Sequence, residues 1–493
     1  MTLGELFAPV RSVTPLASDL AAREVKGVEY DSRRVEDGFV FFAFAGQHAN
    51  GRRFAADAVA RGAVAVAGES PRPDDFAGSW IQVEHGRQAL ALVSRAFYGN
   101  LDERLRLTGI TGTNGKTTVA YLVDAVLRAA GHTTALIGTI EYRIAGHRVE
   151  AVNTTPESLD LNRILARLIS AGGAHVTMEV SSHALALARV YGLRFHTAVF
   201  TNLTRDHLDF HHSMDEYFAA KRRLFEGAGA PPPRCCVLNR DDAYARQIPV
   251  PSGAEAFWYG FGAGSTVRAS HISSSLRGLR FDVECGRTRF AVESALVGRV
   301  NVYNILAACA AGLSHGVAPE TIASGIAQCR SVPGRFERID EGQPFGVVVD
   351  YAHTDDALRN TIAMARALTP GRVVTLFGCG GDRDRTKRPL MGEVAGLLSD
   401  YVVVTSDNPR SEDPLSIIND ALVGLRRRDT PHVVEPNREA AIRRAIEEAH
   451  PGDIVILAGK GHETYQVLKD RTIPFDDREV ARNVLRGFGY GRR

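Results

Sequence analysis

Apolar positions along the chain recur at two spacings, which predict strands and helices in alternation. Residues 105–110 form a short apolar run that is typical of a strand. Residues 119–130 place apolar side chains at helical spacing until Gly131 ends the pattern. Because the glycine-rich segment 109–118 lies between them, the pattern predicts a strand that leads through a glycine loop into a helix.

Residues 1–87 show the same alternation on a smaller scale. A helix is expected to begin near Arg53, among strand-like runs at residues 39–44, 63–67 and 80–83. An amphipathic helix over residues 88–98 follows, and Gly99 and Asn100 end it. This region is therefore expected to be a small α/β domain with a helix that links it to the next one.

Two larger domains are predicted after this helix. Residues 88–334 alternate helices with strand-like runs, which favours a parallel sheet; the runs are 135–140, 175–180 and 197–202. The segment Val332–Arg335 marks the end of this domain. Residues 335–493 then repeat the pattern, with apolar runs at 346–350, 372–377, 401–405 and 453–458.

The predicted fold class is thus α/β with three domains. A small N-terminal α/β module precedes a central P-loop domain with a parallel sheet, and a Rossmann-like doubly wound domain ends the chain. The length agrees with this division, because 493 residues exceed what a single hydrophobic core normally organises.

Composition argues against several kinds of partner. The chain has 59 basic and 57 acidic residues, so no strong field favours nucleic acid or a membrane surface. Its six cysteines include no Cys-x-x-Cys pair, which indicates neither a disulfide framework nor a zinc site and fits a reducing cytoplasm. No stretch is apolar for long enough to span a bilayer, and no signal-peptide pattern is seen. We expect a cytoplasmic monomer that acts on small molecules.

The glycine loop carries the first candidate chemistry. Such a loop directs backbone N–H groups and a helix N-terminus at a phosphate chain. Lys116 can then reach the terminal phosphates, and the Thr117 hydroxyl can bind Mg²⁺. The alternative is a glycine-rich turn with a surface lysine. It would not explain why a strand precedes the loop and a helix follows it. The residues predicted to bind a nucleoside triphosphate are Gly112, Thr113, Asn114, Gly115, Lys116, Thr117 and Thr118.

Two further strand ends carry polar residues on the same predicted edge of the sheet. Glu179 ends an apolar strand, which makes it a natural second Mg²⁺ ligand beside Thr117. The next strand ends in the polar segment 201–209, which contains His207. An isolated histidine would be read as an ordinary loop residue, but its place on this edge favours a metal role.

The loops after the four C-terminal strands also concentrate charged and glycine residues. They are residues 350–353, 378–384, 406–410 and 459–463. Ligands of doubly wound sheets bind beyond the carboxyl ends of the strands. These loops therefore predict a second binding face, which loop polarity alone would not explain.

Four motifs taken together resemble a known family. In chain order, Gly-Thr-Asn-Gly-Lys-Thr-Thr at 112–118, Met-Glu-Val-Ser-Ser-His at 178–183, Thr-Arg-Asp-His-Leu-Asp at 204–209 and Asp-Tyr-Ala-His-Thr at 350–354 are similar to the Mur ligases. These are ATP-dependent amino-acid ligases of peptidoglycan synthesis, and the resemblance covers the whole chain. The segments 153–156 and 407–410 resemble those members that add meso-diaminopimelate to UDP-N-acetylmuramoyl-L-alanyl-D-glutamate.

The resemblance implies a mechanism and a role in cell wall biogenesis, cell shape and cell division. ATP would phosphorylate the γ-carboxylate of the D-glutamyl residue to an acyl phosphate and release ADP. The amine of diaminopimelate would then attack the acyl carbon and expel phosphate. Positive charge must be concentrated where the two anions of the first step meet.

The resemblance also assigns the metal and ATP sites. Thr117 and Glu179 would hold one Mg²⁺, and His207 together with Lys221 a second. The family carries a carbamylated lysine (N6-carboxylysine) at the position of Lys221, whereas the residues alone would suggest a solvated helix lysine. Further ATP contacts are implied for Asn301, Asn304, Arg335 and Asp350, with His353 in the same motif. Asp355 replaces a proline that is common in relatives, and we expect only a loop effect.

Substrate contacts of the UDP-sugar peptide are likewise implied by resemblance. The N-terminal module would bind uridine and diphosphate through Tyr30, Ser32, Gln47, His48 and Ala49. The muramoyl dipeptide would be held by Asn153, Thr154, Thr155, Ser181 and Arg189. Leu187 stands where relatives commonly have glutamine, so one polar contact differs.

The amino-acid pocket must bind the distal carboxylate that distinguishes diaminopimelate from lysine. Arg410 has the planar guanidinium that binds a carboxylate bidentately, and Arg388 offers a second one from a neighbouring loop. By resemblance Asn408, Gly459 and Glu463 complete the pocket, with Glu463 facing a substrate ammonium. Asp407 and Pro409 belong to the same Asp-Asn-Pro-Arg motif.

Other functions remain open at this stage. A lysine-adding ligase of the same fold would differ only in the amino-acid pocket. Folylpolyglutamate synthetase shares the ligase core but normally lacks an N-terminal UDP-binding module. A P-loop kinase would leave the C-terminal loops unexplained. A non-catalytic nucleotide-binding scaffold would not need Glu179, His207 and Lys221 together.

Overall fold

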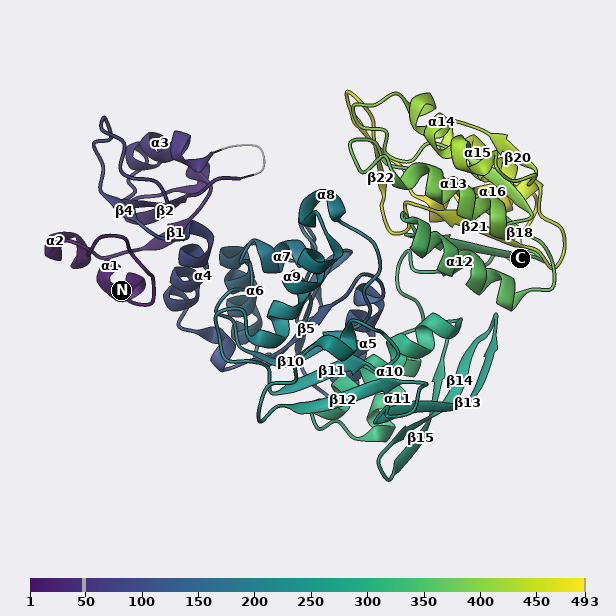
Figure 1. Ribbon diagram of the computed structural model, residues 1–493, viewed down its shortest axis with the longest axis horizontal. Helices are drawn as coiled ribbons and strands as arrows, with labels where there is room; N and C mark the ends of the chain where they lie inside the picture. The colour runs from purple at the N-terminus through teal and green to yellow at the C-terminus, as the bar shows by residue number, and fades with distance from the viewer. Residues whose placement is uncertain (47–49, 492–493) are drawn as a thin grey trace.

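The computed structural model describes residues 1–46 and 50–491. Figure 1 shows three α/β domains in chain order, with the central domain between the N-terminal and C-terminal ones. The predicted fold class is confirmed. Among the described residues, no helix has both the length and the hydrophobicity needed to cross a lipid bilayer.

The N-terminal domain is built on a parallel sheet of four strands in the order β1-β2-β3-β4. The strands are β1 (Gly27–Glu29), β2 (Phe39–Ala43), β3 (Ala65–Gly68) and β4 (Trp80–Gln82). Around them lie α1 (Leu3–Phe7), α2 (Ser18–Ala21), α3 (Ala55–Ala60), α4 (Gly86–Phe97) and the short helices η1 (Ser32–Arg34) and η2 (Gly51–Phe54). The linker helix predicted over 88–98 is α4, and its buried apolar face packs in the core of this domain.

The central domain contains a sheet of eleven strands in the order β15-β14-β13-β12-β11-β10-β5-β9-β6-β7-β8. Its strands are β5 (Arg106–Thr111), β6 (Thr134–Ile137), β7 (Glu141–Ile144), β8 (His147–Glu150), β9 (His175–Glu179), β10 (Phe195–Phe200), β11 (Cys235–Asn239), β12 (Glu255–Gly260), β13 (Val267–Ser275), β14 (Gly278–Cys285) and β15 (Thr288–Ser294). The middle of the sheet is parallel, as predicted. Antiparallel pairs extend it at both ends.

Helices cover both faces of the central sheet. They are η3 (Leu101–Glu103), α5 (Lys116–Ala129), α6 (Ser158–Ser170), α7 (Ser182–Ala186), α8 (Leu208–His211), α9 (Met214–Glu226), η4 (Ala245–Gln247), α10 (Arg299–Ser314) and α11 (Pro319–Gln328). Helices α5 and α10 pack together in one apolar cluster, while α6 and α9 pack in another. The strand, glycine loop and helix predicted from residues 105–130 are β5, the loop that follows it, and α5.

The C-terminal domain is doubly wound around six strands in the order β16-β17-β21-β18-β19-β20. These are β16 (Glu337–Ile339), β17 (Gly346–Asp350), β18 (Val373–Phe377), β19 (Tyr401–Val404), β20 (His432–Val434) and β21 (Ile454–Ala458), with a separate hairpin of β22 (Tyr465–Val467) and β23 (Thr472–Pro474). Helices pack on both faces: α12 (Asp355–Leu368), α13 (Lys387–Leu398) and α14 (Pro414–Leu425) on one, α15 (Arg438–Glu447) and α16 (Asp477–Gly487) on the other. Among the described residues of the six-stranded sheet, β16 is the one strand that runs antiparallel to its neighbour.

Candidate active site

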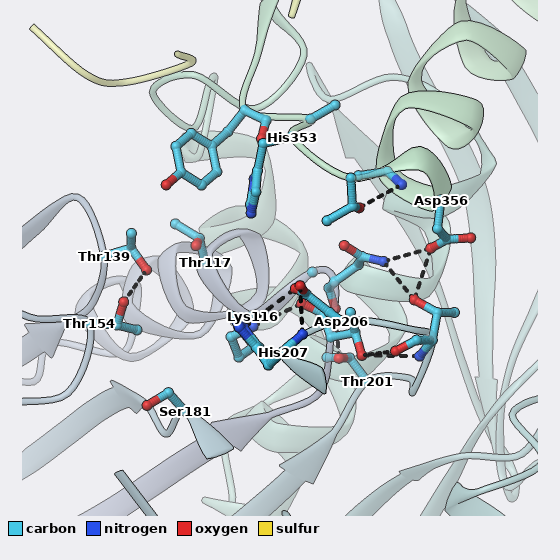
Figure 2. Close-up of a pocket in the computed structure, with 18 of the residues that line it drawn as sticks. Lys116, Thr117, Thr139, Thr154, Ser181, Thr201, Asp206, His207, His353 and Asp356 are labelled. Atoms are coloured by element: carbon cyan, nitrogen blue, oxygen red, sulfur yellow. Dashed lines mark hydrogen bonds and ion pairs between the residues drawn. The ribbon is translucent and has the colours of Figure 1, made fainter. Parts of the chain in front are cut away.

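A cleft of about 1180 Å³ brings together loops of the central and C-terminal domains. Its walls come from the carboxyl ends of β5, β9 and β10 and from the corresponding ends of β17, β18, β19 and β21. Parallel α/β sheets bind ligands at this edge. In Figure 2, His353 and Asp356 of the C-terminal domain lie on the side of the cleft opposite Ser181.

The loop between β5 and α5 has the geometry of an anion site. Gly112 has φ +144, and a Cβ there would come within 1.9 Å of Thr201 Oγ1, so the loop requires glycine at this position. Lys116 opens α5, and its Nζ donates to the carbonyls of Gly112 (3.0 Å) and Thr113 (2.8 Å). Burial lowers the pKa of Lys116 from its ordinary value. The loop thus presents a cation and a helix N-terminus to the cleft.

Thr117 and Glu179 form the oxygen cluster beside this loop. Thr117 Oγ1 donates to Glu179 Oε2 at 3.0 Å, and the backbone N–H of Thr139 donates to Glu179 Oε1 at 2.8 Å. Arg335, at the start of the C-terminal domain, donates from Nη2 to the same Thr117 Oγ1 at 3.0 Å. One carboxylate, one hydroxyl and room for phosphate oxygens fit Mg²⁺, which prefers oxygen ligands shared with the substrate. No group of three His, Cys, Asp or Glu side chains in residues 1–46 and 50–491 is arranged to hold a metal ion by itself.

Lys221 is a buried lysine and not the solvated one that the residues alone would suggest. Its side chain on α9 is 1% exposed, and Nζ donates to the carbonyl of Gly112 at 2.8 Å. Nζ also lies 4.6 Å from the centre of the Tyr217 ring. Burial, with the nearby charge of Lys116, lowers the pKa of Lys221 well below its ordinary value. The amine is therefore held close to the glycine loop and is more readily neutral than a surface lysine.

His207 lies at the same edge in a left-handed backbone conformation with φ +55. Its Nε2 is 3.4 Å from Asp206 Oδ2, and its ring packs edge-on against that of His183 at 4.8 Å between centres. Burial lowers the pKa of His207 to about 3 despite the neighbouring Asp206. A neutral imidazole with an exposed edge on the cleft is a competent metal ligand.

The candidate nucleotide residues at the domain boundary also meet in the cleft. Asn304 Nδ2 donates to Asn301 Oδ1 at 2.9 Å in the first turns of α10. Asp350, at the end of β17, accepts from the N–H of Phe336 at 2.7 Å, and burial raises its pKa. The guanidinium of Arg335 stacks 4.8 Å above the ring of Tyr351.

The residues expected to hold a peptide lie on the other side of the glycine loop. Asn153, Thr154, Thr155, Ser181, Leu187 and Arg189 all line the cleft. Arg189 Nε donates to Glu157 Oε1 at 2.9 Å. Arg87, at the start of α4, donates from Nη1 to the same carboxylate at 3.0 Å. Glu157 thus fixes two guanidinium groups at the edge that faces the N-terminal domain.

Two of the predicted uridine contacts, Tyr30 and Ser32, do not line this cleft. Tyr30 and Ser32 lie in the N-terminal domain, where the Tyr30 hydroxyl donates to Asp160 of α6. Gln47, His48 and Ala49 lie outside the described residues.

The C-terminal wall of the cleft contains Asp407, Asn408, Arg410, Gly459 and Glu463, which are five of the residues expected in the amino-acid pocket. Arg410 adopts φ +53, and its Nη1 donates to the carbonyl of Gly381 at 2.7 Å. Burial of the Glu463 carboxylate and its repulsion by the nearby Asp407 both raise the pKa of Glu463. Pro409 precedes Arg410 but does not itself line the cleft.

The structure corrects the expectation for Arg388. Its side chain is 0% exposed, and its guanidinium donates to Glu412 at 2.7 and 2.9 Å and to Asp420 at 2.9 Å. It is therefore committed inside the C-terminal domain and does not reach the cleft. Arg383, five residues earlier in the loop that precedes α13, lines the cleft instead. The two arginines are close in sequence, but Arg388 is buried at the start of α13 whereas Arg383 is exposed in the preceding loop.

Several other lining residues were not predicted. They include Arg87, Thr139, Asn202, Thr204, Asp206, Asp356, Arg383 and Lys387. Asp356 Oδ2 accepts from Asn114 Nδ2 at 3.0 Å and from Thr204 Oγ1 at 2.9 Å, which ties α12 to the glycine loop. The polar segments 378–384 and 201–209 correctly predict which loops line the cleft, but they do not predict which of their side chains face it.

A P-loop domain that faces a doubly wound domain across a shared cleft, with cations on both walls, is typical of enzymes that act on a nucleoside triphosphate. Family models match along most of the chain: the Mur ligase family catalytic domain at residues 24–98, the Mur ligase middle domain at 110–312, and the Mur ligase glutamate ligase domain at 334–461. The chain belongs to the Mur ligase family and is an ATP-dependent ligase.

Individual relatives agree with this assignment over nearly the full chain. A Solibacter usitatus protein named UDP-N-acetylmuramoyl-L-alanyl-D-glutamate--2,6-diaminopimelate ligase is 68% identical over 490 residues, 99% of each chain. The protein of the same name from Geobacillus kaustophilus is 46% identical over 470 residues, 94% of this chain and 96% of that one. A solved structure with that name has a TM-score of 0.70 at 31% identity and covers 99% of this chain and 100% of its own.

Proposed function

We propose that this chain joins meso-diaminopimelate to the D-glutamyl γ-carboxylate of UDP-N-acetylmuramoyl-L-alanyl-D-glutamate, with ATP converted to ADP and phosphate. The observation that carries the proposal is that one cleft holds both the glycine loop around Lys116 and the Arg410 pocket. Relatives named for this reaction support it, one of them at 68% identity over 99% of this chain. The reaction serves peptidoglycan synthesis, and we propose that a monomer carries it out in the cytoplasm.

Two chemical barriers explain why both halves of the cleft are needed. A carboxylate resists an amine because its charge repels the nucleophile and its oxygen leaves poorly. Transfer of the γ-phosphoryl group to the D-glutamyl carboxylate forms an acyl phosphate and removes both obstacles. The amine then forms the new C–N bond, loses a proton, and phosphate departs. Lys116 on one wall and Arg335 at the domain boundary supply positive charge where the two anions meet.

Thr117 and Glu179 would hold one Mg²⁺, and His207 with Lys221 a second. When bound, these ions supply charge that stabilises phosphoryl transfer. For Lys221 to be a ligand, its amine must first combine with CO₂ to give a carbamate and a proton. The burial of Lys221 and its depressed pKa support this modification, because only the neutral amine reacts. Asn301, Asn304 and Asp350 would contact the rest of the nucleotide.

Recognition of the amino acid is proposed for the C-terminal wall. Arg410 would bind the distal carboxylate of diaminopimelate, and Glu463 would face an ammonium group. Lysine lacks that carboxylate and would leave the Arg410 guanidinium unpaired. The UDP-sugar dipeptide would contact Asn153, Thr154, Thr155, Ser181 and Arg189, with its uridine end on the N-terminal domain near Tyr30 and Ser32.

An ADP-release assay tests the proposal. The purified chain receives ATP, Mg²⁺, the UDP-muramoyl dipeptide and, in turn, meso-diaminopimelate, L-lysine, D-alanyl-D-alanine or glutamate. We expect ADP release to depend on the UDP-substrate and on meso-diaminopimelate together, with a product heavier by one diaminopimelate residue. Release that depends instead on lysine, D-alanyl-D-alanine or glutamate would overturn the assignment.

A further inference from the structure

Lys460 is a fully buried lysine that the proposed function does not use. It follows β21 in the loop 459–463, and its side chain is 0% exposed. It does not line the cleft, although its neighbours Gly459 and Glu463 do. A lysine is almost never fully buried unless its charge is compensated, so its partners indicate why it is there.

The partners of Lys460 are the polar residues of the amino-acid pocket. Nζ donates to Asn408 Oδ1 at 3.1 Å and to Glu463 Oε2 at 3.1 Å, and it lies 3.8 Å from Asp407 Oδ1. Asn408 Nδ2 donates to the same Glu463 Oε2 at 2.8 Å. Lys460, Asn408 and Glu463 therefore close a triangle of hydrogen bonds behind the wall of the cleft.

This triangle fixes both the place and the charge of Glu463. Asp407 and Glu463 bring two carboxylates to one wall, and they repel each other in a poorly solvated site. Gly459 allows Asp407 to lie this close to the loop, because a Cβ there would come within 2.6 Å of Asp407 Oδ2. Lys460 is the cation in hydrogen-bond reach of Glu463 from the side away from the cleft. With Nζ and Asn408 both bound to Oε2, Oε1 of Glu463 is left for a ligand.

We infer that Lys460 is a positioning residue for the amino-acid substrate: it holds Glu463, together with Asn408, so that the free carboxylate oxygen meets a substrate ammonium group. The inference rests on the proposed function, which places the amino acid on this wall. The ligand class is a zwitterionic amino acid, since the wall combines Glu463 with the guanidinium of Arg410.

A purely structural role for Lys460 makes a different prediction. If Lys460 only stabilised the loop, its loss would lower the melting temperature and reduce the active fraction, which lowers the apparent kcat. The KM values of the remaining active enzyme would not change. If it positions Glu463, the loss would appear in the KM for the amino acid and leave the KM values for ATP and the UDP-substrate near those of the wild type.

The experiment compares Lys460→Met, Glu463→Gln and the double variant in the three-substrate ADP-release assay. Lys469→Met is the matched control, because Lys469 is exposed between β22 and β23. We expect Lys460→Met to raise the KM for diaminopimelate by about tenfold or more, because a displaced Glu463 would lose its charged contact to the substrate. The double variant should lie within about threefold of Glu463→Gln, because residues that act as one unit are not additive.

The outcomes separate the inference from the function on which it rests. An unchanged diaminopimelate KM in Lys460→Met, or effects of the two substitutions that multiply, would overturn the role of Lys460. If Lys460→Met does not fold, the double variant removes the unpaired carboxylate as well, and its KM is compared with that of Glu463→Gln alone. A wild-type chain that releases no ADP with diaminopimelate would instead overturn the proposed function.

Discussion

Arg335 donates a hydrogen bond from Nη2 to Thr117 Oγ1 across 3.0 Å, so the first residues of the C-terminal domain touch the P-loop helix directly. Thr117 in turn donates to Glu179, which places the guanidinium at the end of a chain of contacts that leads from the domain boundary to the phosphate site. The position of the C-terminal domain is thereby coupled to the group that would bind the metal.

Replacement of Arg335 tests this coupling. Arg335→Ala removes a cation beside the proposed phosphate site and should lower kcat about 100-fold, the usual cost of one lost charge-stabilising group. Steady-state ADP release measures it. Arg330→Ala is the control, because Arg330 is exposed only five residues away. A kcat within about twofold of wild type for Arg335→Ala would remove Arg335 from the mechanism.

Lys221→Ala should be nearly inactive and partly rescued by short carboxylic acids. The added carboxylate would replace the oxygen atoms of the proposed carbamate in the space that the buried side chain leaves. The measurement is ADP release with increasing acetate or propionate, and Arg223→Ala on the exposed side of α9 serves as control. Rescue by short alkylamines in place of acids would show that Lys221 acts as a cation.

The salt bridge between Arg438 and Asp477 should matter for stability. Both side chains are 0% exposed, with Nη2 to Oδ2 at 2.6 Å, and Arg438 also donates to the carbonyls of Ser406 and Ala458. Arg438→Met should cost about 3–5 kcal/mol, because it leaves Asp477 as an unpaired buried charge. Thermal unfolding measures the loss. The double variant Arg438→Met, Asp477→Leu should recover part of it, and a single variant as stable as wild type would contradict the argument.

A histidine cluster at the amino end of the central sheet should make the fold sensitive to acid. The rings of His132 and His175 stack at 4.0 Å, and those of His196 and His315 at 4.7 Å. Burial lowers the pKa of His175 to about 4 and that of His315 to about 3, and the charged groups that act on them besides the other histidines are cations such as Arg106.

The sign of the pH effect follows from these shifts. A histidine whose folded pKa lies below its unfolded value contributes its full stability above about pH 6.5, and this is lost as the pH falls toward the folded pKa. The protonation of His175 alone should lower the free energy of unfolding by about 2 kcal/mol between pH 7 and pH 5. The melting temperature of His175→Phe should therefore fall less steeply over this range than that of the wild type. Exposed His147→Gln is the control, and parallel curves for wild type and His175→Phe would refute the account.

The sequence predicted the site best where backbone rules decide which residues meet. Lys116, Glu179 and His207 follow three parallel strands, and the carboxyl ends of such strands share one edge, so their convergence could be foreseen. The antiparallel extension β13–β15 was not among the predicted runs. Its middle strand β14 nevertheless alternates buried Leu279, Phe281 and Val283 with polar residues, which is the pattern of a half-buried strand.

Within the loops, the sequence could not predict which side chains point into the cleft. Arg383 and Arg388 lie in one charged segment, and sequence favoured Arg388 although its guanidinium is bound to Glu412 and Asp420. Lys460 was overlooked for the opposite reason. A lysine between two glycines is read as exposed, whereas tertiary packing buries it behind the pocket.

Arg410 carries the proposed choice of amino acid. Arg410→Ala should raise the KM for diaminopimelate strongly and leave the KM values for ATP and the UDP-substrate near normal, because the variant lacks only the guanidinium that would pair with the distal carboxylate. The measurement is ADP release with each substrate varied in turn. An unchanged KM for diaminopimelate would remove Arg410 from the pocket.

The ratio of kcat/KM for meso-diaminopimelate to that for L-lysine tests the central claim most directly. A guanidinium left unpaired by lysine costs a few kcal/mol, so the wild type should prefer diaminopimelate by roughly a thousandfold, and Arg410→Ala should lose most of this preference. A wild-type ratio near or below one would contradict the account and identify a lysine-adding ligase.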